Sequence, residues 1–197
     1  MIKHLLLDID GLVLKKEMYF SDRIAKDFGI DPHDVIRFFK NEYKLCQIGK
    51  ADLKKEIEKY LPIWGWKKSV DELLTYWFTA ESDIDQNVIE FVDKLQAQGV
   101  HCYLQTNNEK YRLQYIAETL QLSKHFEKIL ASSELSVGKP NIEFWGKIHE
   151  AIGKPEKQQV LVWDNEKPCV DSAKAFGFNA EIYTTFETFR SKIQSML

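Results

Sequence analysis

The chain has 197 residues, of which 44% are hydrophobic and 29% charged, the composition of an ordinary globular protein. This length accommodates one domain with a good core, or a core domain that carries an inserted one. The formal net charge of −3 gives no basic footprint for a nucleic acid, and no apolar run is long enough to span a membrane.

The cysteines are odd in number and widely spaced, at Cys46, Cys102 and Cys169, and no C-x-x-C pair occurs. We therefore expect reduced thiols in a cytoplasmic protein rather than disulfides or a thiolate metal site. The first apolar run begins so close to residue 1 that we also expect no signal peptide.

The chain opens with a short apolar run, His4-Leu5-Leu6-Leu7, which predicts a buried strand over residues 1–7. Asp8 and Asp10 follow two residues apart, so on an extended chain their carboxylates point to the same side. Like charges this close disfavour each other unless a cation lies between them. Gly11 then permits a sharp turn and a close approach of a ligand. A solvated Asp-Gly turn is the alternative, and this stretch alone leaves both interpretations open.

Residues 15–82 have helical periodicity and no strand pattern. Ser21 is placed to cap a helix that ends at Gly29, and the pair Asp31-Pro32 is a cap followed by proline at the first helical position. Residues 51–61 form an amphipathic pattern, and Ser69 begins another helix. The segment therefore predicts an all-helical unit of about four helices.

Beyond residue 83, helical and strand patterns alternate. Helices are predicted over residues 88–98, 111–120, 141–152 and 168–176 and at the C-terminus, and strands over residues 100–105, 128–131, 159–163 and 180–183. This alternation predicts right-handed crossovers and a parallel sheet, with the helical unit inserted after the first strand.

The unusual polar residues all follow strands, where α/β sheets place their ligand sites. Taken singly, each has an ordinary explanation as a helix cap, a solvated loop or a turn. Taken together, they predict a site at the carboxyl edge of the sheet, formed by Asp8, Asp10, Thr106, Asn107, Lys139, Asp164 and Asn165.

Four motifs in this order resemble the haloacid dehalogenase-like hydrolase superfamily, in the branch with a helical cap inserted after strand one. They are Leu7-Asp8-Ile9-Asp10-Gly11, Leu104-Gln105-Thr106-Asn107, Gly138-Lys139-Pro140, and Val162-Trp163-Asp164-Asn165 with Ala173-Lys174-Ala175-Phe176-Gly177 downstream. The resemblance covers essentially the whole chain. It implies an α/β core with a parallel Rossmann-like sheet and helices on both faces, formed by residues 1–14 and 84–197, and a helical cap formed by residues 15–83.

The resemblance also implies the roles of the site residues. Asp8 would be the nucleophile that forms an aspartyl-phosphate, and Asp10 the general acid and then base. Thr106, the amide of Asn107 and Lys139 would bind the phosphate, with Lys139 neutralising its charge and that of Asp8. Magnesium would take the Asp8 carboxylate, the Asp10 carbonyl and the fourth motif, Asp164 or Asn165.

Two positions refine this expectation. Dehalogenating relatives lack an acid two residues after the nucleophile, so Asp10 favours phosphate chemistry. Asn165 departs from the family pattern, because it stands where an acidic metal ligand is customary, nine residues before Lys174. An amide oxygen brings no charge to a hard cation, so we expect a weaker magnesium site, which Asp164 would support directly or through water.

In the family the cap closes over the site, with hinges here expected at residues 14–17 and 81–85. The cap aromatics are expected to form its core rather than to line a pocket; these are Trp64, Trp66, Tyr76, Trp77 and Phe78. The specificity candidates are Lys15, Lys16, Tyr19, Phe20, Arg37, Lys44 and Gln47.

Two functional hypotheses follow. The first is a magnesium-dependent phosphatase for a small phosphorylated metabolite such as a sugar phosphate, with no nucleic-acid or membrane partner, as a monomer or a homodimer. The second is a catalytically weak or inactive binding or regulatory protein whose metal site is impaired by Asn165. A metal-free dehalogenase is a distant third.

Overall fold

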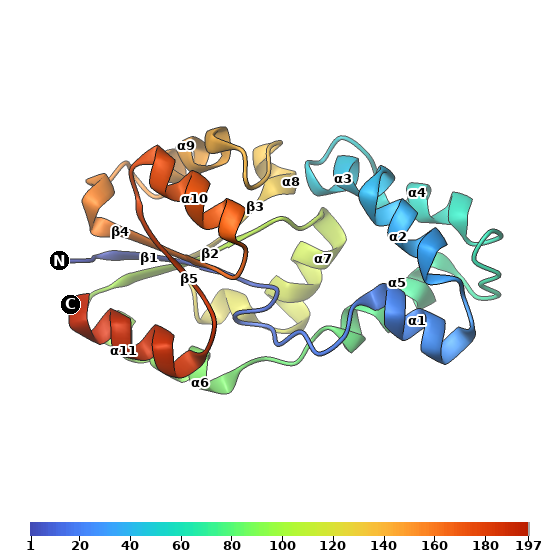
Figure 1. Ribbon diagram of the computed structural model, residues 1–197, viewed down its shortest axis with the longest axis horizontal. Helices are drawn as coiled ribbons and strands as arrows, with labels where there is room; N and C mark the ends of the chain where they lie inside the picture. The colour runs from blue at the N-terminus through green and yellow to red at the C-terminus, as the bar shows by residue number, and fades with distance from the viewer. Residues whose placement is uncertain (197) are drawn as a thin grey trace.

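The computed structural model describes residues 1–196 and divides them between a sheet-containing core and a helical unit (Figure 1). The strands are β1 (His4–Asp8), β2 (His101–Thr106), β3 (Lys128–Ala131), β4 (Val160–Asp164) and β5 (Asn179–Ile182). The helical unit holds α1 (Phe20–Phe28), α2 (Pro32–Lys40), α3 (Glu42–Gln47), α4 (Leu53–Tyr60) and α5 (Val70–Ala80). The core helices are α6 (Gln86–Ala97), α7 (Lys110–Gln114), α8 (Ser132–Leu135), α9 (Ile142–Ala151), α10 (Lys167–Phe176) and α11 (Phe186–Met196).

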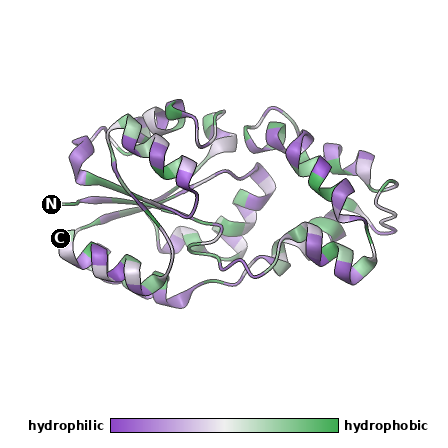
Figure 2. Ribbon diagram, viewed as in Figure 1, coloured by the Kyte–Doolittle hydropathy of each residue, from purple (hydrophilic) through white to green (hydrophobic). Residues whose placement is uncertain are grey.

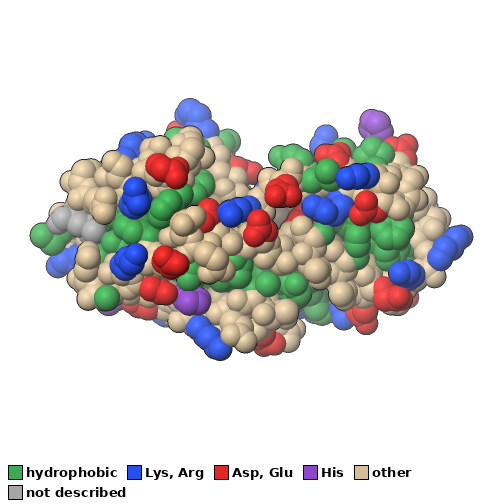
Figure 3. Space-filling model, turned by 90° about the horizontal axis from the view of Figure 1, so that it is seen from below, with side chains coloured by type: hydrophobic (Ala, Val, Ile, Leu, Met, Phe, Trp, Pro, Cys, Tyr) green, Lys and Arg blue, Asp and Glu red, His purple; other side chains and the backbone are tan. Residues whose placement is uncertain are grey.

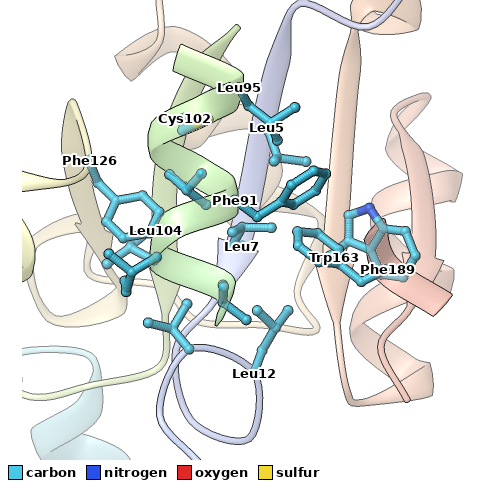
Figure 4. Packing of buried hydrophobic residues seen from close by; sticks show 14 of the residues in the cluster. Leu5, Leu7, Leu12, Phe91, Leu95, Cys102, Leu104, Phe126, Trp163 and Phe189 are labelled. Atoms are coloured by element: carbon cyan, nitrogen blue, oxygen red, sulfur yellow. The ribbon is translucent and has the colours of Figure 1, made fainter. Parts of the chain in front are cut away.

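The five strands are all parallel, in the order β3-β2-β1-β4-β5. Successive side chains of β1 point to opposite faces, so Leu5 and Leu7 enter one hydrophobic cluster and Leu6 enters the other. Helices α6 and α11 cover the first face, where Phe91 and Phe189 pack against β1 and Trp163 (Figure 4). Helices α9 and α10 cover the second. The predicted Rossmann-like α/β fold is confirmed.

Residues of the helical unit bury a hydrophobic cluster of their own. Hydrophobic and hydrophilic residues alternate along these helices (Figure 2), and the buried hydrophobic residues of α1–α5 all belong to this cluster. Trp64, Trp66, Trp77 and Phe78 are buried in this cluster, as predicted, and Tyr76 packs against it half-buried. Tyr111 and Tyr115, which follow β2, close the cluster on the side that faces the core.

Two chain crossings connect the helical unit to the core, and they are hydrogen-bonded to each other. The Lys15 N–H donates to the carbonyl of Asp83, and the Asp85 N–H donates to that of Val13, at 2.8 and 2.9 Å. Leu14 and Ile84 form a β-bridge between these contacts. The crossings coincide with the segments expected to act as hinges.

Several element boundaries differ from the predictions for local reasons. β1 begins at His4 rather than at residue 1, and Ser21 lies inside α1, whose N-cap position is Tyr19. Helices α3 and α8 were not predicted from the sequence. The helix predicted over residues 111–120 is α helical only to Gln114 and continues as a π-helical turn, Tyr115–Thr119.

Over residues 1–196, none of the helices combines the length and apolar character needed to cross a bilayer. The three cysteines are buried free thiols, as expected.

Candidate active site

The carboxyl ends of the three central strands bring the predicted site residues together. β1 lies between β2 and β4, with Leu7 level with Leu104 on one side and Trp163 on the other. Asp8, Thr106 and Asp164 end these strands and are buried. This is the point where the strand order reverses, and such points form crevices in open α/β sheets.

Lys139 links the two buried carboxylates. Its ammonium lies 2.8 Å from Asp8 Oδ1 and 2.7 Å from Asp164 Oδ2, and its side chain is 4% exposed. Burial raises the pKa of the Asp8 carboxyl to about 7, although Lys139 opposes the shift. Burial alone would lower the pKa of Lys139, but the two carboxylates raise it above its ordinary value. Lys139 therefore stays charged, and it stabilises the ionised form of Asp8.

The loop that carries Lys139 is fixed by Asn107. The Asn107 side chain donates to the Lys139 carbonyl at 2.9 Å and accepts from its N–H at 2.8 Å. Gly138 permits this approach, since a Cβ there would lie 2.6 Å from Asn107 Oδ1. The Asn107 side chain is thus committed to positioning Lys139, and its backbone amide is the group available to a phosphate.

Asp10 has two donors from the segment that follows β2. The amide of Asn108 donates to Asp10 Oδ2 at 2.8 Å, and Arg112 Nη2 lies 3.4 Å from Oδ1. Asn108 also donates to the Thr106 hydroxyl oxygen at 2.7 Å. The two acids therefore differ in surroundings, because Asp8 faces Lys139 and Asp10 faces a neutral amide and an arginine.

Asp164 has little capacity left for another ligand. Its Oδ2 accepts from Lys139 and from the Gln105 amide at 3.1 Å, and its Oδ1 accepts from the Glu166 N–H at 2.9 Å. The completely buried carboxylate thus serves as an internal counter-charge for Lys139.

Asn165 packs on the turn after β1. Its amide nitrogen donates to the Asp10 carbonyl at 3.3 Å. Gly11 has φ +94°, and a Cβ on it would lie 2.3 Å from this nitrogen, so the turn requires glycine. Within residues 1–196, no group of three or more His, Cys, Asp or Glu side chains is arranged to hold a metal ion.

A cavity of about 470 Å³ lies between the core and the helical unit. Most of the site residues line it, whereas the buried Asp164 does not: Asp8, Asp10, Thr106, Asn107, Asn108, Arg112, Lys139 and Asn165. Charged side chains of both signs gather where the two lobes meet (Figure 3). Of the predicted specificity residues, Lys16, Tyr19, Phe20, Lys44 and Gln47 line the cavity, whereas Lys15 and Arg37 do not. Trp77, which was expected to form the cap core rather than to line a pocket, is buried in the helical cluster and also lines the cavity. The helical unit contributes further residues that were not predicted: Ser21, Ile36, Phe39, Lys40, Tyr43 and Glu81.

Four polar residues of the core that belong to the site were not predicted from sequence: Gln105, Asn108, Arg112 and Glu166. Gln105 and Asn108 flank the predicted Thr106-Asn107 pair, and an uninterrupted polar run after a buried strand was a usable signal. Arg112 gave no signal, because an arginine in a short helix ordinarily faces solvent.

The chain is similar to known proteins of one hydrolase family. The model of the haloacid dehalogenase-like hydrolases matches residues 2–177. The GMP/IMP nucleotidase YrfG of Escherichia coli is 23% identical over 181 residues, which cover 87% of this chain and 78% of that protein.

Solved structures show the same fold. The magnesium complex of the HAD family enzyme bt-2542 from Bacteroides thetaiotaomicron has a TM-score of 0.83 at 18% identity and covers 98% of each chain. A predicted HAD-like family hydrolase from Porphyromonas gingivalis has a TM-score of 0.81 at 17% identity and covers 100% of this chain and 98% of its own. L-2-haloacid dehalogenase from Xanthobacter autotrophicus has a TM-score of 0.65 at 18% identity, over 99% of this chain and 83% of its own.

Proposed function

The chain belongs to the haloacid dehalogenase-like hydrolase family, and on that premise we propose that it is a magnesium-dependent phosphatase of small phosphorylated metabolites. One observation carries this proposal. A second acid, Asp10, follows the buried Asp8 by two residues, lines the same cavity and is held in place by Asn108. Hydrolysis of an alkyl phosphate ester needs such a proton donor, because an alkoxide is a poor leaving group, whereas displacement of a halide does not.

The arrangement supports a two-step reaction. A carboxylate oxygen of Asp8 attacks phosphorus while the ester P–O bond breaks, and the leaving oxygen takes a proton from Asp10. Asp10 then takes a proton from water, whose oxygen attacks phosphorus as the Asp8–phosphorus bond breaks. Lys139 favours the ionised form of Asp8 and balances the charge on the phosphate, and Thr106 with the Asn107 amide binds the phosphate oxygens.

The donor set at the turn after β1 fits magnesium, because it consists of oxygens. Lys139 binds Oδ1 of Asp8, so Oδ2 remains available to a cation, and the Asp10 carbonyl and the Asn165 side-chain amide lie beside each other. These three residues would hold the ion, which would supply positive charge to the transferring phosphoryl group. Asp164 would act through Lys139.

The substrate we propose is a phosphate monoester of the size of a nucleotide or a sugar phosphate. A cavity of about 470 Å³ suits a ligand of this size. The relative YrfG is named a GMP/IMP nucleotidase, which makes nucleoside 5′-monophosphates the first compounds to assay. Sugar phosphates are the second class.

The test is a panel of phosphorylated metabolites assayed for phosphate release with magnesium. We expect turnover of at least one class, and a loss of at least about a thousand-fold in kcat for Asp8→Asn. Thr188→Ser, on the exposed part of α11, is the matched control and should behave as wild type. Turnover that survives Asp8→Asn would exclude Asp8 as the nucleophile.

A second candidate function follows from the hydrogen bond of Asn165 to the Asp10 carbonyl. If this amide is never displaced, the protein binds phosphorylated ligands without hydrolysing them. That hypothesis predicts no turnover at any magnesium concentration, with phosphate-dependent thermal stabilisation retained. Turnover of any panel member would eliminate it.

A further inference from the structure

A buried arginine joins the proposed proton donor to the helical unit. Arg112 is 1% exposed, although it belongs to the short helix α7. Its Nη1 donates to the carbonyl of Phe78 at 3.0 Å, and its Nη2 donates to that of Glu81 at 2.6 Å. The same Nη2 lies 3.4 Å from Asp10 Oδ1. One guanidinium therefore reaches both the end of α5 and the acid of the core.

The buried surroundings of Arg112 restrict its guanidinium to these acceptors. A buried charge is costly unless it is paired and hydrogen-bonded. Within residues 1–196, Asp10 is the one carboxylate paired with Arg112, and the carbonyls at the C-terminal end of α5 add partial negative charge. The rings of Phe78 and Tyr115 lie 5.4 and 5.8 Å from the guanidinium carbon and limit its movement. If α5 shifts, Arg112 loses two of its three acceptors.

The position of Asp10 depends on this contact. Asp10 lies in the turn after β1, and its side chain is 35% exposed, so the turn alone does not fix its rotamer. Asn108 holds Oδ2, and Arg112 faces Oδ1. With both donors present, the plane of the carboxyl group is set relative to Asp8.

We propose that Arg112 is a positioning residue that couples the orientation of Asp10 to the docking of helix α5. Proton transfer from Asp10 to the leaving oxygen then requires the helical unit to lie against the core. This inference rests on the proposed function, in which Asp10 protonates the leaving group as the ester P–O bond breaks.

Leaving-group dependence provides the test. A p-nitrophenolate leaves without a proton, whereas an alkoxide needs one, so only alkyl phosphates depend on a well-placed acid. For Arg112→Met we expect kcat/KM to fall about a hundred-fold on an alkyl phosphate and less than about three-fold on p-nitrophenyl phosphate. The ratio kcat/KM is the quantity to compare, because it reports only the steps up to the departure of the leaving group. Asp10 acts as a base after that step.

Three further variants separate positioning from general loosening. Arg112→Lys keeps the charge but lacks the two-armed guanidinium that reaches all three acceptors. Its selective loss should therefore be smaller than that of Arg112→Met. Tyr111→Phe removes a bond between α7 and Asp52 without touching Asp10, and should change both substrates by one common factor. Asp10→Asn with Arg112→Met should lose no more on the alkyl phosphate than Asp10→Asn alone.

The outcomes are distinguishable. Equal losses on the two substrates in Arg112→Met, or an Arg112→Lys variant with no selective loss, would overturn the coupling and leave the phosphatase intact. Absence of wild-type turnover on both substrates and on every compound of the metabolite panel would overturn the proposed function, and this inference with it.

Discussion

Asn165 is a neutral residue at the position where the proposed cation would be held best by a charged ligand. Its amide N–H satisfies the Asp10 carbonyl at 3.3 Å. The neighbouring carboxylates offer little compensation, because Lys139 pairs with both Asp8 and Asp164. We therefore expect affinity for the cation to be limited by charge rather than by the number of oxygens.

Asn165→Asp should tighten magnesium binding by about ten-fold, equivalent to about 1.4 kcal/mol. Without the ion, the new carboxylate faces the Asp10 carbonyl, so the variant should melt below wild type in chelator and above it in magnesium. Titration calorimetry and thermal melts in both conditions check this. Unchanged magnesium affinity would show that residue 165 contributes nothing to the cation site.

The polar residues that follow the predicted strands indicated which side chains meet, because the carboxyl ends of parallel strands lie at the same edge of a sheet. The structure brings Asp8, Asp10, Lys139 and Asn165 to one edge of the sheet. The contacts of Arg112 were not predictable, because they depend on the position of α5, which is distant in sequence and enters through tertiary packing.

Among the elements, α4 is tied to α7 through its N-cap residue. Asp52 accepts from the Lys55 N–H, from Lys110 at 2.6 Å and from the Tyr111 hydroxyl at 2.9 Å. Although burial opposes the shift, the bonds from Lys110 and Tyr111 lower the pKa of Asp52 from 3.8 to about 2. The folded state therefore favours the ionised form.

Asp52→Asn should lower the free energy of unfolding by about 1 kcal/mol at pH 7, after discounting for solvent screening. Because the folded pKa is the lower one, this stabilisation is complete above about pH 5 and is lost as the pH falls from about 4 to about 2. Asparagine retains the cap, so the change isolates charge. Urea unfolding from pH 7 to pH 3 tests it.

The exposed pair of Lys54 and Asp71 provides the control for this measurement. Its atoms also lie 2.6 Å apart, but Asp71 is 73% exposed, so Asp71→Asn should cost less than about 0.5 kcal/mol at any pH. A pH-independent cost for Asp52→Asn would contradict the ionic explanation.

Element boundaries were predictable where a local signal fixes them. Asp31, Ser69 and Asn141 each cap the helix expected to begin there, because their side chains bond the first turn. Helix α3 was missed because Asn41 separates it from α2 without a proline or glycine, and its limits depend on packing. The π-helical turn after Gln114 likewise has no local marker.

At the scale of the whole molecule, the hydrophobic cluster of the helical unit is separate from those of the core, and two chain crossings connect the two parts. We propose that residues 15–83 act as one cap that opens and closes by rotation at these crossings. Leu73 is completely buried in the helical cluster, and Leu6 is completely buried under α9 and α10. The two clusters can therefore be weakened independently.

Leu73→Ala and Leu6→Ala should each cost about 2–5 kcal/mol, because both leave a cavity in a packed cluster. Hydrogen exchange should separate them. In Leu73→Ala, amides of α1–α5 should exchange faster while those of the strands keep their protection. In Leu6→Ala, amides of the strands should exchange faster while those of α1–α5 keep their protection. Equal acceleration in both regions by Leu73→Ala would mean that the clusters unfold as one.

The position of the Trp77 indole makes its fluorescence useful for following the cavity. Trp77 lines the cavity, and its Nε1 donates to the Glu81 carboxylate at 2.9 Å, beside the crossing that leads back to the core. Its emission will respond both to a ligand in the cavity and to movement of that crossing. The unlabelled protein therefore carries its own optical probe, with which occupancy and closure can be followed in real time, and Trp77→Phe supplies the blank.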